Sequence, residues 1–344
     1  MAKRHEVTEL LGDGIAEELR QSVRAVAASL PVEVAFDTVN LEHSNRRSAG
    51  RPIYDQAAAS MRRTGVGIKY PTATVEESPN AVLRKLLKFA VIHRPVTTIP
   101  GLKTHFTGKI DLDIVRVATG GTYEDPGQMI GDYAAVSLRM VDRKTCEQAA
   151  HYAFSVAARD RKSLTSSSKY TIQRVTDGLF EDIVADVAKE MTFAGQVEHH
   201  RELFDALLAK LVMKPEAFQV ILVLNEYGDF LSDLASGLIG SLGLGASVSL
   251  AFDDRGRVSV GMFDAVHGTA PDIAGQDKAN PTAILLAFSL LLAHLGEPKA
   301  AGALRRGLFD CLDAKEATPD LGGDLGTQAF TEAVIRRAAE RLKG

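Results

Sequence analysis

The sequence predicts an α/β protein with two lobes, and three observations support this. The chain has 344 residues, which is above the size at which one hydrophobic core usually stops growing. Apolar runs alternate with amphipathic stretches over most of its length, a pattern that favours helices packed on a twisted, partly parallel sheet. No internal repeat or Pro/Ser-rich linker interrupts the alternation, so we expect the second lobe to be interleaved with the first.

The spacing of apolar residues places the main elements along the chain. Helical periodicity predicts helices over 81–89, 145–158, 177–189 and 328–342. The continuous apolar run 220–224 predicts a buried strand. Residues 248–252 and 257–260 flank the turn at 253–256 and together predict a hairpin. Residues 133–141 are a further candidate strand.

Composition and charge exclude several classes of function. The formal net charge is −4 and no basic tract is present, so we expect no nucleic-acid partner. The longest apolar stretch, 283–293, is too short to span a bilayer, so we expect no membrane role. Cys146 and Cys311 fit no metal or redox spacing and are expected in the core. We therefore expect a cytoplasmic protein.

Residues 225–234 follow the predicted buried strand directly, where ligands of open α/β sheets gather. If a helix starts near Asp229, then Asp229 and Asp233 share one face of it. The opposite side would be packed by Phe230, Leu231, Leu234 and Leu238. Two carboxylates on one turn suit Mg²⁺ or Mn²⁺. The alternative is that Asp229 caps the helix and Asp233 is a solvated surface residue.

A second segment predicts an anion site. Ser78 followed by Pro79 is typical of a helix start, with the serine as cap. Asn80 and Arg84 then fall on one face near the helix N-terminus, whose free N–H groups favour anions. Three arginines could bind the carboxylates of one substrate as a set: Arg84, Arg94 and Arg116. Each arginine alone could equally be a surface charge.

A third segment, residues 263–275, ends with Asn280-Pro281-Thr282 and is rich in small residues. Small side chains would let a cofactor lie against the backbone, and Asp272 could accept hydrogen bonds from ribose hydroxyls. The segment does not contain the G-x-G-x-x-G fingerprint of dinucleotide-binding proteins. On composition alone, the segment is predicted to be just a loop.

Together, these segments resemble the β-decarboxylating dehydrogenases, the family of isocitrate, homoisocitrate and isopropylmalate dehydrogenases. Six motifs occur in the family's order: Gly12-Asp13-Gly14-Ile15, Arg94-Pro95-Val96, Thr176-Asp177-Gly178-Leu179-Phe180, Tyr227-Gly228-Asp229, His267-Gly268-Thr269-Ala270-Pro271 and Thr318-Pro319-Asp320-Leu321-Gly322-Gly323. The resemblance implies the isopropylmalate dehydrogenase-like fold. Its large discontinuous domain would comprise residues 1–90 and 240–344. Its small domain would comprise residues 91–239, including a dimer clasp at 121–164.

The resemblance also implies a role for each candidate residue. Asp229 and Asp233 would bind Mg²⁺ or Mn²⁺ with Asp205 of the neighbouring subunit of a homodimer. Lys169 would be the catalytic lysine, also acting across the dimer, and Tyr123 the proton donor. Substrate would contact Thr74, Ser78, Asn80, Arg84, Arg94 and Arg116. NAD would contact His267, Gly268, Thr269, Ala270, Asp272, Ile273 and Asn280.

By this resemblance the reaction is the oxidative decarboxylation of a 2-hydroxy polycarboxylic acid. Ser78 and Asn80 occupy positions that contact the third carboxylate in isocitrate dehydrogenases, whereas isopropylmalate enzymes have apolar residues there. Isocitrate, converted to 2-oxoglutarate, therefore ranks first. Asp272 would repel the 2′-phosphate of NADP, which favours NAD.

Several positions depart from the family pattern near the expected site. Tyr70 replaces a glycine, Thr171 an asparagine and Asp264 a glutamate, and residues 117–121 lack the family's acidic residues. These departures leave two alternatives open. The same chemistry could act on a homoisocitrate-like, isopropylmalate-like or phosphonate-analogue acid, or the chain could be a non-catalytic regulatory subunit.

Overall fold

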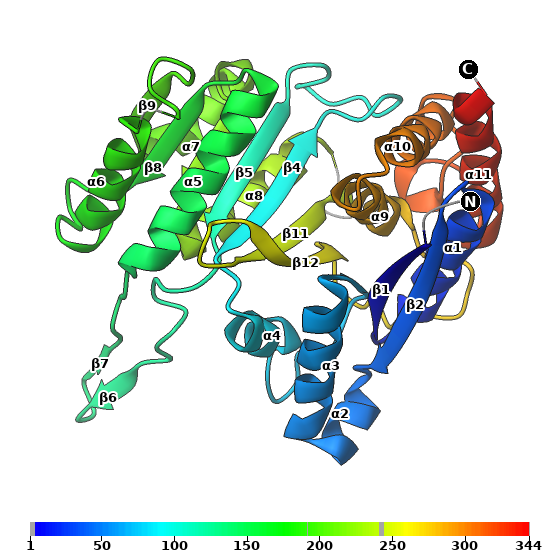
Figure 1. The fold of residues 1–344 in the computed structure, drawn as a ribbon, viewed down its shortest axis with the longest axis horizontal. Helices are drawn as coiled ribbons and strands as arrows, with labels where there is room; N and C mark the ends of the chain where they lie inside the picture. The colour runs from blue at the N-terminus through cyan, green and yellow to red at the C-terminus, as the bar shows by residue number, and fades with distance from the viewer. Residues whose placement is uncertain (1–3, 191, 241–243, 344) are drawn as a thin grey trace.

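The computed structural model describes residues 4–190, 192–240 and 244–343. They form one large mixed sheet with helices on both of its faces (Figure 1). The strands are β1 (Arg4–Leu11), β2 (Glu33–Asn40), β3 (Val66–Lys69), β4 (Val91–Thr97), β5 (Asp111–Val117), β6 (Gln128–Ile130), β7 (Ala134–Val136), β8 (Leu164–Ser168), β9 (His199–Leu203), β10 (Val220–Val223), β11 (Ala246–Phe252) and β12 (Val258–Ala265).

The α-helices are α1 (Ala16–Ser29), α2 (His43–Ala49), α3 (Arg51–Thr64), α4 (Pro79–Leu87), α5 (Arg143–Asp160), α6 (Thr176–Ala188), α7 (Phe204–Met213), α8 (Asn225–Leu238), α9 (Thr282–His294), α10 (Pro298–Asp313) and α11 (Thr327–Lys343). The described residues also include the short 3₁₀ turns η1 (Pro215–Ala217) and η3 (Pro319–Leu321). None of the helices in the described ranges is long and apolar enough to cross a membrane.

Ten strands of the large sheet lie in the order β2-β1-β3-β12-β11-β4-β5-β10-β8-β9. Pairing is parallel towards both edges, whereas β11 is antiparallel to β12 and β4, and β4 is antiparallel to β5. The pairing of β11 with β4, for example Val248 with His93, connects the two halves of the sheet. The predicted α/β class is confirmed. The domain boundaries near residues 90 and 240 stay a prediction.

The sheet is apolar on both faces because successive side chains of a strand point to opposite sides. On β12, Phe263 and Ala265 join a core that includes residues of α1, α5 and α9. Val260 and Met262 of the same strand join a second core with residues of α3 and α4, such as Tyr54. The two faces thus bury different helices, and the site described below lies beside α4.

The predicted helices are confirmed as α4, α5, α6 and α11, and the two cysteines are buried and unbridged. The predicted start of α8 is wrong, because the helix begins at Asn225 and places Asp229 in its second turn. The predicted packing of Phe230 is also wrong, since 56% of this residue is exposed. The candidate strand over 133–141 contains only the short β7.

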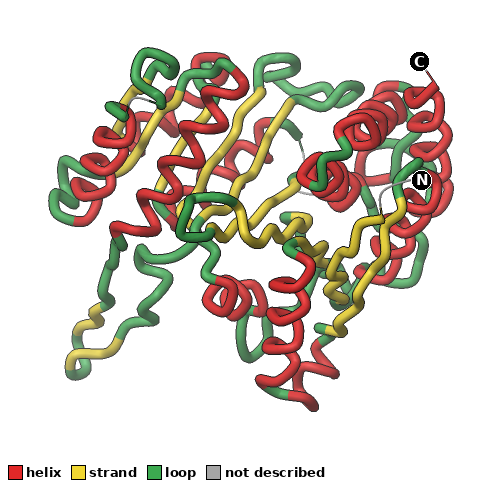
Figure 2. The backbone as a smooth tube through the Cα atoms, viewed as in Figure 1, coloured by secondary structure: helices red, strands yellow, loops and turns green. Residues whose placement is uncertain are grey.

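The strands β6 and β7 form a thin hairpin that projects from the body of the molecule (Figure 2). Gly121 and Met140 pair at its base, where the chain leaves and returns to the body. We call residues 121–140 the clasp hairpin. It carries seven exposed large apolar side chains: Tyr123, Met129, Ile130, Tyr133, Val136, Leu138 and Met140. Water-exposed apolar residues at this density are typical of a surface that another chain covers.

Candidate active site

A polar cavity of about 200 Å³ lies where α4 begins and where β3 and β12 end. Ser78 caps α4, because its hydroxyl accepts a hydrogen bond of 3.4 Å from the backbone N–H of Ala81, and Pro79 occupies the first turn. Residues predicted to bind substrate or cofactor line this cavity: Thr74, Ser78, Asn80, Arg84, Arg94, His267 and Gly268. Lys69, Ser247 and Asp264 line it as well.

Five buried polar atoms of the cavity residues have no hydrogen-bond partner among the residues that the structure describes. They are Oδ1 of Asn80, Nε of Arg84, Nε of Arg94, Oδ1 of Asp264 and Nε2 of His267. A buried polar atom without a partner is costly, and most such atoms in folded proteins are satisfied. Their concentration in one small cavity indicates that a polar ligand completes their bonds.

The cavity also concentrates positive charge. Lys69, Arg84 and Arg94 face one carboxylate, that of Asp264. Burial lowers the pKa of Lys69 to about 8 and lowers the pKa of Arg84. Burial likewise raises the pKa of the Asp264 carboxyl. A ligand with several carboxylates would relieve the repulsion among these cations.

A second group of charged residues adjoins the cavity through Arg94. Its Nη1 lies 3.6 Å from Oδ1 of Asp229 and 3.9 Å from Oδ1 of Asp233. Arg116 pairs with Asp229 through its own Nη1, and the Tyr123 hydroxyl donates to Oδ2 of Asp229 at 3.2 Å. The structure therefore brings five predicted site residues together: two arginines, two aspartates and the tyrosine.

The position of Arg116 depends on α8. Its Nε and Nη2 donate to Oδ1 of Asn225 at 3.0 and 2.8 Å, and Nδ2 of Asn225 donates to the carbonyl of Gly120. Gly228 leaves room for this side chain, because a Cβ there would lie 2.5 Å from Cγ of Arg116. Burial lowers the pKa of Arg116 to about 10. Asn225 thus orients a predicted substrate arginine.

Lys169 and Asp205 form a separate pair, with Nζ and Oδ1 2.7 Å apart. The hydrogen bond from Lys169 keeps the pKa of the Asp205 carboxyl below its usual value. Within the described ranges, no three His, Cys, Asp or Glu residues are close enough to hold a metal ion together. Asp205 therefore does not join Asp229 and Asp233 inside one chain, and its action across a dimer stays a prediction.

The predicted cofactor residues occupy the loop between β12 and α9. The loop packs on the first motif, since the N–H of Ile15 donates to the carbonyl of Thr269 at 2.9 Å. Gly14 permits this approach: its φ is +61° and a Cβ would lie 2.0 Å from the Thr269 oxygen. Asp272 is exposed, and Asn280 donates to Asp320 at 2.8 Å. The loop thus presents backbone and short polar side chains, with Ala270 and Ile273 half-buried.

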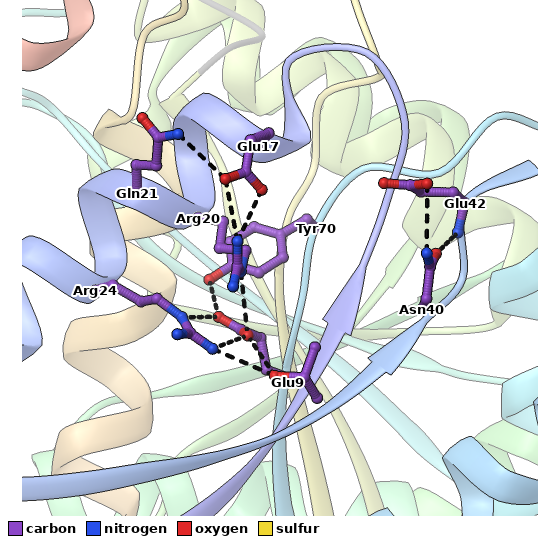
Figure 3. Close-up of polar contacts among 9 residues, drawn as sticks. Glu9, Glu17, Arg20, Gln21, Arg24, Asn40, Glu42 and Tyr70 are labelled. Atoms are coloured by element: carbon purple, nitrogen blue, oxygen red, sulfur yellow. Dashed lines mark hydrogen bonds and ion pairs between the residues drawn. The ribbon is translucent and has the colours of Figure 1, made fainter.

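The departure at Tyr70 has a local explanation. The Tyr70 side chain is fully buried, and its hydroxyl donates to Oε1 of Glu9 at 3.2 Å (Figure 3). Burial opposes the charge of Glu9, but hydrogen bonds from Arg24 and Thr38 outweigh it and lower the carboxyl's pKa. Nζ of Lys69 donates to the carbonyl of Tyr70 at 3.0 Å. Tyr70 therefore anchors the end of β3 beside the cavity.

Sequence patterns did not single out Lys69, Ser247 and Asn225 as site residues. Lys69 ends a buried strand and Asn225 begins a helix, and both positions are frequent in α/β sites. The rule that ligands bind at the carboxyl ends of strands therefore indicates both Lys69 and Asn225 as candidates. Ser247 faces the cavity only because β11 lies beside β12, a pairing that the sequence pattern does not define.

Comparisons with known proteins agree with this geometry. The model of the family "Isocitrate/isopropylmalate dehydrogenase" matches residues 6–334. Subunit 2 of the mitochondrial NAD isocitrate dehydrogenase of Kluyveromyces lactis is 36% identical, covering 97% of this chain and 90% of that protein. A protein named as a regulatory subunit of the mitochondrial NAD isocitrate dehydrogenase of Dictyostelium discoideum is 32% identical, covering 99% and 94%. The crystal structure of isocitrate dehydrogenase from Methylococcus capsulatus matches with a TM-score of 0.87 at 34% identity, covering 97% of this chain and 99% of that one.

Proposed function

Because the chain belongs to the isocitrate/isopropylmalate dehydrogenase family and is an NAD-dependent decarboxylating dehydrogenase with that family's isopropylmalate dehydrogenase-like fold, we propose that it converts isocitrate to 2-oxoglutarate. The observation that carries the proposal is the cavity at the start of α4. Three cations and five buried polar atoms without a partner among the described residues surround about 200 Å³ there. A small acid with several carboxylates would balance the charge of these cations and supply acceptors for Nε of Arg84 and Nε of Arg94, while its hydroxyl would supply a donor for an oxygen of Asn80 or Asp264.

The start of α4 supports a tricarboxylic acid over an acid with an apolar side group. Ser78 and Asn80 both line the cavity, and Oδ1 of Asn80 is buried without a partner in the described part of the chain. An isopropyl group here would leave the hydroxyl of Ser78 and the amide of Asn80 without a ligand partner, which binding sites reject strongly. A carboxylate would instead accept from Nδ2 of Asn80 and lie near Arg84.

Lys169 and Tyr123 would carry out the two proton transfers of the reaction. Lys169 of the partner subunit would take the proton of the substrate's 2-hydroxyl while the hydride at the same carbon passes to NAD. The neighbouring carboxylate then leaves as carbon dioxide, and its bonding electrons form an enolate. Tyr123 would protonate the enolate carbon, consistent with its hydroxyl lying at the carboxylate pair.

Asp229 and Asp233 fit a hard divalent cation. Both carboxylates are partly exposed on one side of α8, and arginines balance their charge in this structure. Mg²⁺ or Mn²⁺ held by them, with Asp205 of the partner subunit, would lower the pKa of the 2-hydroxyl and polarise the ketone.

The proposed assembly is a homodimer with shared active sites. The exposed apolar side chains of the clasp hairpin support it, because a second clasp hairpin would cover them. A pair of chains would also bring Lys169 and Asp205 of one protomer towards Asp229 of the other. The cytoplasmic location stays a prediction.

Mixing the purified protein with Mg²⁺, NAD and a panel of 2-hydroxy acids tests the proposal. We expect NADH absorbance and carbon dioxide release to be fastest with isocitrate, and chelation of the metal to abolish both. Faster turnover of homoisocitrate, isopropylmalate or a phosphonate analogue would keep the chemistry and reject isocitrate as substrate.

A regulatory role is the second candidate, because one relative is named a regulatory subunit. Against it, Tyr123, Lys169, Asp205, Asp229 and Asp233 are all present. A folded homo-oligomer that turns over none of the acids, yet binds them, would favour this candidate.

A further inference from the structure

The carboxylate of Asp177 forms hydrogen bonds with both the clasp hairpin and Lys169. It lies in the first turn of α6 and is fully buried. One oxygen, Oδ2, accepts hydrogen bonds from the backbone N–H of Lys169 at 2.8 Å and from the Tyr227 hydroxyl at 3.0 Å. The other, Oδ1, accepts from Nη2 and Nε of Arg139 at 2.9 and 3.2 Å. Asp177 therefore joins residues from three separate segments.

Arg139 bridges two buried carboxylates. Besides Asp177, it pairs through Nη1 with Glu226, whose side chain is 6% exposed. Glu226 packs against Gly121, where the clasp hairpin leaves the body. Arg139 itself lies where the hairpin returns, next to Met140, which pairs with Gly121. Both ends of the clasp hairpin, at Gly121 and at Arg139, thus contact the ion pairs that Arg139 forms with Asp177 and Glu226.

The side chain of Lys169 is also connected to Asp177, through a second series of contacts. Nζ of Lys169 pairs with Asp205, and the preceding residue, Phe204, stacks on Tyr227 with ring centroids 4.4 Å apart. Tyr227 connects Phe204 to Asp177, because its hydroxyl donates a hydrogen bond to the Asp177 carboxylate. The guanidinium of Arg139 lies 5.0 Å above the Tyr227 ring. Both the backbone and the amine of Lys169 therefore depend on contacts that converge on Asp177.

We propose that Arg139 is a positioning residue, which acts through Asp177 to hold Lys169 in place and ties that placement to the clasp hairpin. The proposal rests on the proposed function only in assigning the proton transfer to Lys169. Without Arg139, two buried carboxylates would lie near each other with no cation between them, and the Asp177 side chain would shift towards water. This shift would move the oxygen that binds the Lys169 backbone.

The test compares Arg139→Met with Arg139→Lys and with Arg143→Met as a matched control. Arg143 lies four residues further on, is exposed, and pairs only loosely with Glu147 at 3.7 Å. We expect Arg139→Met to lower kcat by about 10- to 100-fold, the size of effect that a displaced reacting group produces. We expect KM for isocitrate to stay nearly unchanged, because Arg84 and Arg94, which would bind its carboxylates, line the cavity and do not contact Arg139. Arg139→Lys should retain most of kcat, and Arg143→Met all of it.

A second measurement does not need turnover. Reductive methylation of Lys169, followed by peptide mass spectrometry, reports how firmly its amine is held. We expect methylation to become several-fold faster in Arg139→Met and to stay at the wild-type rate in Arg143→Met. Sedimentation would establish that each variant keeps the assembly of the wild type.

If Arg139→Met does not fold, Arg139→Lys and Tyr227→Phe decide the question. Tyr227→Phe keeps the stacked ring and removes one hydrogen bond from Asp177, so a smaller loss of kcat with faster methylation of Lys169 is expected. Wild-type kcat and wild-type methylation in Arg139→Met, or in Tyr227→Phe where Arg139→Met does not fold, would overturn the proposal, as would a loss that appears equally in the Arg143 control. Absence of turnover in the wild type, together with the expected change in methylation, would reject the proposed function and leave the positioning role standing.

Discussion

The hydroxyl of Tyr123 donates a hydrogen bond to Asp229 at 3.2 Å, on the carboxylate that also pairs with Arg116. Burial and the neighbouring charge of Asp229 raise the pKa of Tyr123, so the phenol keeps its proton throughout the physiological pH range. A tyrosine that stays protonated beside Asp229, a proposed metal ligand, is suited to donate that proton when the substrate acquires negative charge.

Tyr123→Phe should therefore lower kcat by about 100-fold or more, the usual contribution of a positioned proton donor. Tyr133→Phe is the matched control, because Tyr133 is 99% exposed at the tip of the same hairpin. Initial rates of NADH formation measure both variants. A Tyr123→Phe enzyme with the wild-type rate would show that another group supplies the proton.

Asn80→Leu should lower kcat/KM for isocitrate by about 10- to 100-fold, because it removes an amide that lines the proposed substrate cavity and would donate to a carboxylate. The loss should be smaller for isopropylmalate, whose side group is apolar. Ala81→Leu, an exposed neighbour on the same helix, is the control and should change neither value. Equal losses for both acids would mean that Asn80 does not select the third carboxylate.

Asp272→Lys should raise the preference for NADP over NAD by at least about tenfold, or about 1.4 kcal/mol. The exposed carboxylate of Asp272 would repel a 2′-phosphate, whereas a lysine would attract it. Asp254→Lys makes the same charge change on the turn between β11 and β12, outside the cofactor loop. If both variants shift the preference equally, net charge rather than position would be responsible.

Glu181 gives a pH-dependent prediction for stability. Its carboxyl is 1% exposed and accepts hydrogen bonds from Ser166 and Ser168, just before Lys169. Burial raises the pKa of the Glu181 carboxyl. The protonated carboxyl therefore contributes its full stabilisation of the folded state below the unfolded-state pKa, and this stabilisation is lost as pH rises through the folded-state pKa. Glu181→Gln cannot ionise and should avoid this loss.

Thermal melts across the pH range test this prediction. At acidic pH the wild type and Glu181→Gln should melt together, and at pH 8 the variant should melt higher, by about 1.4 °C for each kcal/mol in a chain of 344 residues. Asp182→Asn alters the next, exposed carboxyl and should give no pH-dependent difference. A variant that is less stable at every pH would show that the ionised carboxylate is stabilised in the native state.

Local sequence patterns predicted the parts of the site that one segment encodes. Ser78 caps α4 as expected because a cap and a following proline suffice to start a helix. The start of α8 was misplaced because Asn225 begins the helix immediately after β10 and uses its side chain to bind Arg116. Nothing within that segment indicates a distant arginine as the partner.

Residues that meet only through the sheet were harder to predict. Lys69, Ser247 and Asp264 converge because β3, β12 and β11 are neighbours, although β3 is separated from the other two by about half of the chain. The pair of Tyr70 and Glu9 likewise depends on β1 lying beside β3. The family resemblance identified most of the site residues, whereas their hydrogen-bond partners required the strand order.

The exposed apolar side chains of the clasp hairpin, in the proposed homodimer, would make folding depend on the concentration of the chain. If a second chain covers them, association and folding share one equilibrium, and the melting temperature rises with protein concentration by mass action. Dilution then uncovers this surface and favours unfolding or aggregation together with dissociation. The abundance of the protein in a cell would thereby set the fraction of chains that are folded as well as the fraction that are paired.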